Sequence, residues 1–158
     1  MHTTKNDLAE ENREKIVEML NARLADATDL KSQAKQAHWN VKGIHFFQLH
    51  ELFDQVATAV EAHIDLIAER ATALGGTALG TIRTAAQNSL LAEYPLEIID
   101  GRDHVDALST AMADFGKRVR QNIDDADEFG DADTADLFTE ISREIDKLLW
   151  FVEAHVQA

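Results

Sequence analysis

The chain has 158 residues, and 45 % of them are apolar, which is enough for a single domain that buries its own core. There is no cysteine, so disulfides and thiolate metal ligands are excluded, and any metal would be held by imidazole and carboxylate groups. The formal net charge of -14 argues against the neutralisation of phosphates on which non-specific DNA binding depends.

No apolar stretch approaches the length of a membrane span, and residues 1–15, MHTTKNDLAEENREK, lack the apolar region of a signal peptide. We therefore expect a cytoplasmic protein without a membrane partner. Association with the nucleoid would be compatible with that location.

The first helix is expected to begin at Asp7, whose carboxylate can cap the first turn while Glu10 reaches back to it. Residues 1–6 would then form a flexible tail. The apolar face of this helix ends at His38, and a lone histidine in that position is more often packed in a core than bound to a metal. Trp39 is expected to be a packing residue, although an indole beside an oxidising centre could also act as a radical sink.

A second helix of roughly 30 residues is predicted from Gly43 to the Gly75–Gly76 pair, since the stretch has no proline and few poor helix formers. Four side chains that can bind a metal lie on it, in two pairs with i,i+4 spacing. They are His50 with Asp54, and Asp65 with Glu69. At about 100° per residue all four fall on one stripe, opposite the apolar residues and therefore away from the core. His45 and His63 fall on the apolar side and are expected to be packed.

The two pairs are too far apart to bind one ion. Asp54 and Asp65 are separated by eleven residues, or about 16 Å along a helix axis. The pairs are symmetric about the bond between Ala59 and Val60, so a two-fold axis there would bring each pair against the other pair of an antiparallel partner. This spacing predicts two identical metal sites, each shared between two subunits. The alternative is that both pairs are simply solvated, as such pairs on exposed helices commonly are.

The segment from Thr77 to Gly101 is long for a connection in a compact bundle, and TIRTAAQNS within it is expected to form a short helix. Pro95 should end any helix just before it. The last two helices are predicted to begin at Asp100 and around residues 131–133, where acidic side chains favour a helix start. His104, near the first of these starts, is expected at the surface.

Two runs of this sequence, KQAHWNVKGIHFFQLHELFD and DLIAERATALGG, resemble the signature of the Dps family, the mini-ferritins named as DNA-binding proteins from starved cells. The similarity continues through GTALGTIRTAAQNS and DTADLFTEISREIDKLLWFVEAH, so it covers most of the chain. It implies an all-α fold of one domain over residues 1–158: a ferritin-like four-helix bundle with a short extra helix in the long crossover between helices 2 and 3. It also implies a homo-oligomer, a hollow dodecameric shell with ferroxidase centres at dimer interfaces.

Matched position by position, the metal ligands of the family fall on five residues of this chain. They are His38, His50 and Asp54 from one subunit, and Asp65 and Glu69 from its two-fold mate. The resemblance implies iron as the metal, with zinc or manganese as competitors, since imidazole and carboxylate suit these ions better than copper(I). It further implies ferrous iron and hydrogen peroxide as the substrates.

The end of the third helix and the start of the fourth carry many acids in NIDDADEFGDADTAD, although the helix dipole disfavours acids at a C-terminal end. In ferritin-like shells this corner lines a cation pore at a three-fold axis. The resemblance implies that Asp127, Asp131 and Asp136 belong to such a pore. A merely soluble acidic loop is the alternative.

The function that these features favour is iron storage and detoxification, with ferrous iron oxidised at the shared sites and ferric mineral stored in the shell. The alternative is a DNA-binding, nucleoid-compacting protein. Its usual basis in the family is a lysine-rich N-terminal tail, whereas residues 1–15 hold three basic side chains against four acidic ones. We expect no direct DNA binding near neutral pH, with bridging by a divalent metal as the remaining route. A purely structural bundle is the third possibility.

Overall fold

Four long helices and one short helix make up most of residues 1–157, the part of the chain that the structure, a computed structural model, describes. They are α1 (Glu10–Asn40), α2 (Phe46–Ala73), α3 (Ile82–Asn88), α4 (Gly101–Glu128) and α5 (Ala132–Glu153). These residues form no β-strand, only an isolated parallel bridge between Lys42 and Asp100. The predicted all-α fold, with a short helix in the crossover, is confirmed.

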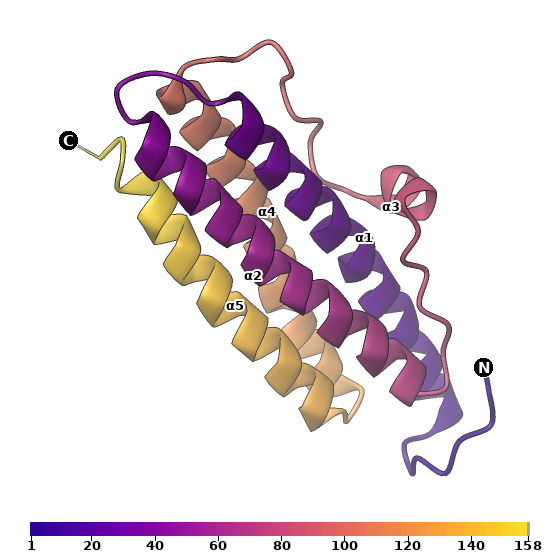
Figure 1. The fold of residues 1–158 in the computed structure, drawn as a ribbon. Coiled ribbons are helices and arrows are strands. Elements are labelled where there is room, and N and C mark those ends of the chain that lie inside the picture. Colours follow the sequence, from indigo (N-terminus) through magenta and orange to yellow (C-terminus); the bar gives the residue numbers. More distant parts are fainter. Residues whose placement is uncertain (158) are drawn as a thin grey trace.

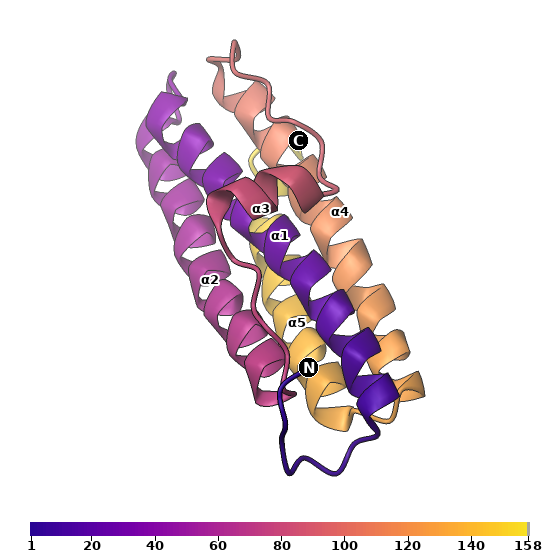
Figure 2. The same cartoon turned by 90° about the vertical axis from the view of Figure 1, so that its right-hand side faces the viewer.

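The long helices form two hairpins that pack against each other (Figure 1). One hairpin pairs α1 with α2 and the other pairs α4 with α5, while the crossover, residues 74–100, returns along the bundle to connect them. In the view turned by 90°, α3 lies across the outside of α1 (Figure 2), which it contacts. Because the crossover spans the length of the bundle, α2 and α4 run in the same direction.

The long helices bury their apolar stripes against one another. Phe53, Phe115 and Phe138, from α2, α4 and α5, are fully buried, and leucine and isoleucine side chains of α1 join the same core. Burial of one such side chain stabilises the fold by about 1.5–3 kcal/mol. No helix within residues 1–157 combines the length and the hydropathy needed to cross a membrane.

The end of α2 depends on two glycines. Gly75 has a φ of 86°, in the left-handed region that favours glycine. A Cβ atom on Gly76 would collide with the side chain of Val17 on α1. The two glycines therefore allow the chain that follows α2 to pack closely against α1. The helix ends where the sequence predicted.

Acidic caps mark the starts of the last two long helices, as predicted. Asp100 accepts a hydrogen bond from the amide of Arg102 at the start of α4. Asp131 accepts one from the amide of Thr134 at the start of α5. Both caps satisfy amide groups that have no partner within the helix.

The predicted start of the first helix is wrong. The helix begins at Glu10 and has no side-chain cap, so Asp7 lies outside it. The reason is a local turn, in which the side chain of Asn6 accepts from the amide of Leu8 while Arg13 donates to the carbonyl of Leu8. Residues 1–6 continue beside the end of α2, and their flexibility stays a prediction.

Three side chains lie where the sequence did not place them. His104 is only 1 % exposed, because the crossover lays Tyr94 against it. His45 is exposed, because it lies in the turn just before the first residue of α2. Trp39 is 66 % exposed and so does not pack in the core of its own subunit. His63 is buried, as predicted.

A buried ion pair joins the end of α2 to the turn between α4 and α5. Arg70, in the last turn of α2, donates to Asp131 at 2.6 Å and to the hydroxyl of Thr134 at 2.9 Å. Asp131 also accepts from the hydroxyl of Thr134 and is 3 % exposed. Burial alone would raise the pKa of Asp131, but the hydrogen bonds from Arg70 and Thr134 together outweigh it and hold the pKa below its ordinary value.

Replacement of Asp131 by alanine is expected to lower the free energy of unfolding by about 2–3 kcal/mol, because it removes a helix cap and the partner of Arg70. The control is Asp133→Ala, since Asp133 is exposed and lies 3.7 Å from the same guanidinium. Asp133→Ala should lower the free energy of unfolding by less than about 1 kcal/mol. Chemical denaturation at neutral pH measures both losses, and equal losses would contradict the structural role of Asp131.

The same comparison should depend on pH. The folded pKa of Asp131 is lowered, so its contribution is complete above the pKa of an unfolded aspartate and is lost as the pH falls through the folded pKa. The difference between the wild-type protein and Asp131→Ala should therefore shrink in acid.

Candidate metal-binding site

The candidate site begins with two histidines from different helices. His38 lies in the last turn of α1 and His50 near the start of α2, and the short turn between these helices brings them together. Their rings stack with centroids 3.7 Å apart and an angle of 19° between the planes. Both side chains are partly exposed.

Each of these rings is fixed by the backbone of the other histidine. Nδ1 of His38 lies 2.7 Å from the carbonyl oxygen of His50, and Nδ1 of His50 lies 2.8 Å from the carbonyl oxygen of His38. A carbonyl oxygen only accepts hydrogen bonds, so both Nδ1 atoms carry a proton and donate. Nε2 is then the nitrogen of each ring that is left to bind a metal, which is the arrangement of a histidine whose second nitrogen is a ligand.

Asp54 lies one turn after His50 on α2, and Lys35 of α1 donates to its Oδ1 atom at 2.5 Å. This hydrogen bond is the main cause that holds the pKa of Asp54 below its ordinary value, and the charge of Lys35 lowers it further. Asp54 is therefore ionised at neutral pH. An ion that takes this oxygen must first displace the ammonium group of Lys35.

The remaining two predicted ligands, Asp65 and Glu69, lie further along α2 and are exposed. The structure thus groups three of the five predicted ligands near the turn between α1 and α2 and keeps the other two apart. Among residues 1–157, no three histidine, aspartate or glutamate side chains lie close enough to hold an ion. Neither group is a complete metal site within the single chain.

The three residues of the predicted pore have different surroundings. Asp127, in the last turn of α4, and Asp136, in α5, are exposed. Asp131 cannot line a channel in this conformation, because its buried carboxylate is bound by Arg70 and Thr134. We correct the predicted set accordingly, and only Asp127 and Asp136 are carried forward.

Two features near these residues were missed in the sequence. Lys35 precedes His38 by three positions on α1, and that spacing could have placed it on the same face. The hydrogen bond between Tyr94 and His104 has no such signal, because one residue lies in the crossover and the other in α4.

The chain matches a known protein family over most of its length. The ferritin-like domain family matches residues 17–158, which include all of the long helices except the first turns of α1. The bundle with its long crossover is therefore a ferritin-like domain.

Individual relatives within the ferritin-like proteins are Dps proteins. The DNA protection during starvation protein of Agrobacterium fabrum is 47 % identical over 156 residues, which cover 99 % of this chain and 96 % of that protein. The Dps structure from Mycobacterium smegmatis has a TM-score of 0.94 at 27 % identity, with 99 % of this chain and 95 % of that chain covered. The Dps structure from Vibrio cholerae O1, described as a member of a broad superfamily of ferritin-like diiron-carboxylate proteins, has a TM-score of 0.91 at 27 % identity, with 99 % and 98 % covered. The chain belongs to the Dps family.

Proposed function

We propose that this protein stores and detoxifies iron: it oxidises ferrous iron at sites shared between two subunits and keeps the ferric product as mineral inside a shell of twelve subunits. Membership of the Dps family supports iron storage and protection, and the V. cholerae relative is described as a diiron-carboxylate protein. The observation that carries the proposal is the pair of stacked histidines whose Nδ1 atoms are held by backbone carbonyls, which leaves Nε2 of each ring to bind an ion beside the ionised Asp54.

The predicted ligands suit iron, which is a substrate here and gains positive charge when it is oxidised. Imidazole binds ferrous iron, and carboxylates favour the higher charge of ferric iron. A shared site with two imidazoles and three carboxylates would be rich in oxygen, and zinc or manganese would compete for it. Hydrogen peroxide is the oxidant that we infer, because two ferrous ions supply the two electrons that its reduction needs.

The need for a partner follows from the length of α2. His50 and Glu69 are about 28 Å apart along its axis, so only an antiparallel α2 of a second subunit would bring them to one ion. Two large apolar side chains beside the histidines, Trp39 and Phe47, are exposed in the single chain. A partner would cover them, as expected for apolar surface at an interface.

Co-expression of His50→Ala subunits with Glu69→Ala subunits should restore part of the ferroxidase activity that each variant lacks alone. In each mixed pair one site carries both defects and the other carries neither, so random pairing rebuilds about a quarter of the sites. Ferric absorbance after addition of ferrous iron and peroxide measures the recovery.

The control pairs His50→Ala with Asp54→Ala subunits. Both changes lie in the same half-site, so every site of a mixed pair keeps one defect and no recovery is expected. If the first mixture remains as inactive as this control, the shared site is wrong.

The double variant Asp127→Asn with Asp136→Asn should take up iron several-fold more slowly, because exposed carboxylates at the α4–α5 corner would draw cations towards the shell. Oxidation of iron that is already bound should be unchanged. Stopped-flow absorbance, with peroxide added either together with iron or after loading, separates the two steps. The variant Glu14→Gln with Glu18→Gln removes the same charge from the exposed side of α1, and equal slowing in both variants would refute a pore at this corner.

DNA binding is the second candidate, since the A. fabrum relative is named for the protection of DNA. Protection does not require contact, because removal of iron and peroxide removes the source of the damaging radicals. With a charge of -14 on each chain, a shell would repel phosphates. We infer a cytoplasmic shell that meets the nucleoid only through bridging metal ions.

A mobility shift at low salt with a chelator present tests this inference, because electrostatic binding is strongest under those conditions. The expected result is that DNA migrates as it does without protein. Retardation with the chelator present would establish direct binding and overturn the inference. Retardation only after addition of magnesium would support bridging by metal.

A further inference from the structure

The only tyrosine of the chain makes a hydrogen bond to a buried histidine. The hydroxyl of Tyr94, in the crossover, lies 2.6 Å from Nδ1 of His104 on α4. Tyr94 is partly buried, and only 1 % of His104 is exposed. The contact fastens the crossover to the start of α4.

Burial determines which partner holds the proton. It raises the pKa of Tyr94 and lowers the pKa of His104, so the phenol is protonated and the imidazole is neutral. The hydroxyl therefore donates to Nδ1, and Nε2 carries the proton of the ring. Asp103 and the backbone carbonyls of Asn40 and Ile98 favour the charged form of this ring, so they would stabilise a second proton on it.

This arrangement favours oxidation of the phenol. A phenol that loses an electron becomes a strong acid and must lose its proton as well. A base within hydrogen-bonding reach can take that proton without rearrangement of solvent. Nδ1 of His104, 2.6 Å away, is such a base.

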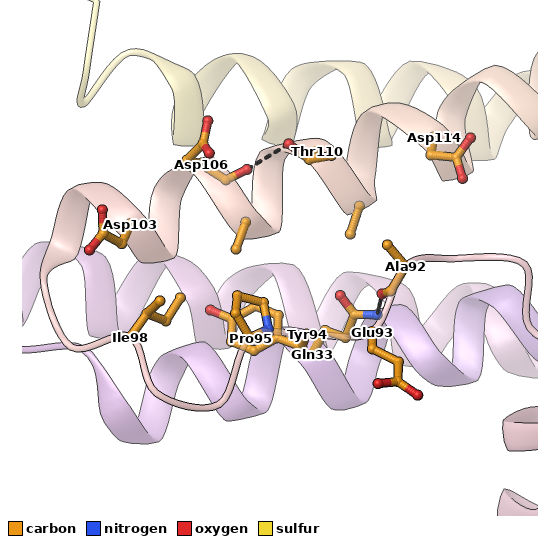
Figure 3. Close-up of a pocket in the computed structure, with 12 residues that line it drawn as sticks. Gln33, Ala92, Glu93, Tyr94, Pro95, Ile98, Asp103, Asp106, Thr110 and Asp114 are labelled. Carbon is orange, nitrogen blue, oxygen red and sulfur yellow. Dashed lines mark hydrogen bonds between the residues drawn. The ribbon is translucent and has the colours of Figure 1, made fainter.

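The pair also lies beside the part of α1 that carries a predicted iron ligand. Asn40, whose backbone is close enough to His104 to raise its pKa, is the last residue of α1 and follows His38 by two positions. Tyr94 itself lines an open cavity of about 480 Å³ between α1, the crossover and α4 (Figure 3). Small solutes can therefore approach the tyrosine from solvent.

We propose that Tyr94 and His104 form a one-electron relay that intercepts the hydroxyl radical produced when a single ferrous ion reacts with peroxide; this rests on the iron oxidation proposed above. The ferrous ion gives peroxide one electron, which yields ferric iron, a hydroxide ion and a hydroxyl radical. Tyr94 gives the radical an electron, which makes a second hydroxide ion, and passes its proton to Nδ1 of His104. A second ferrous ion then reduces the tyrosyl radical while the proton returns.

Trp39, considered as a radical sink from the sequence, is less suited to this role. The ammonium group of Lys35 lies 5.6 Å from the centre of its ring. This positive charge opposes the positive charge that an oxidised indole would carry. Tyr94, in contrast, has a proton acceptor in contact.

Freeze-quench electron paramagnetic resonance on the assembled wild-type protein tests the relay. Protein loaded with at most one ferrous ion per site is mixed with peroxide, and the experiment is repeated on protein grown with ring-deuterated tyrosine. We expect a radical whose hyperfine pattern narrows with the label, and the assignment is unique because Tyr94 is the only tyrosine. A signal that the label leaves unchanged, or no protein radical, would overturn the relay.

The variant His104→Gln separates a proton acceptor from a simple hydrogen-bond partner. Glutamine can accept the hydrogen bond of the hydroxyl but cannot take its proton, so the yield of tyrosyl radical should fall by about tenfold or more. Spin-trapped hydroxyl radical should rise at the same time. His45→Gln is the matched control at an exposed histidine and should change neither quantity. Equal tyrosyl yields in the wild-type protein and His104→Gln would reject the role of His104.

Two further measurements separate a failed relay from failed iron oxidation. Ferric absorbance in the same samples reports the proposed function, and normal ferric formation without a tyrosyl radical rejects the relay alone. If no ferric iron forms, or if His104→Gln does not fold, photolysis of the iron-free wild-type protein makes the Tyr94 radical directly. Transfer into D₂O should then remove a hyperfine coupling that comes from the proton on His104, and a radical without this coupling would reject the relay.

Discussion

The separation of two ligand pairs along α2 is the constraint on which the rest of the structure depends. A helix of 28 residues is a stiff spacer, and its apolar face is fixed because it buries Phe53 and Ile67 in the core. Neither pair can approach the other unless this helix unfolds. The chain therefore keeps the two pairs of predicted ligands apart, and on the proposed mechanism iron oxidation cannot begin before a second subunit docks. Assembly and chemistry would then be a single event.

The other elements keep this spacer and its surroundings in place. A row of polar side chains on α1 holds the crossover: Asp26 and Gln33 bond to its backbone, and Asp29 accepts from the hydroxyl of Ser89. Asp26 accepts from the amide of Leu90 at 2.7 Å, and Gln33 donates to the carbonyl of Ala92 at 3.0 Å. Burial is the main cause that raises the pKa of Asp26, which shows how fully this carboxyl is enclosed. These contacts fix the crossover on α1 and so position Tyr94 for its hydrogen bond to His104 on α4.

Helical periodicity predicted the features that depend on one helix at a time. The length of α2, its outward stripe of histidine and carboxylate side chains and the caps of α4 and α5 all follow from local spacing. Two of the errors have a different cause, since each concerns a side chain whose partner lies in another element. Asp131 is drawn inward by Arg70, and His104 is covered by the crossover. The reciprocal hydrogen bonds of His38 and His50 could not be predicted for the same reason, because they cross a turn that no periodic pattern describes.

Lys35 connects the two proposals physically. Its ammonium group holds Asp54 in the iron-free chain, so an ion that binds there must displace a cation as well as gain a ligand. Competition from Lys35 would lower the affinity of the site for ferrous iron, so the arrival of a second ion would be delayed. Single occupancy is the dangerous state, because one ferrous ion can give peroxide only one of the two electrons that it needs. The relay would act at this step, since Tyr94 supplies the missing electron and the next ferrous ion returns it. The more firmly Lys35 holds Asp54, the more the safety of the reaction depends on Tyr94.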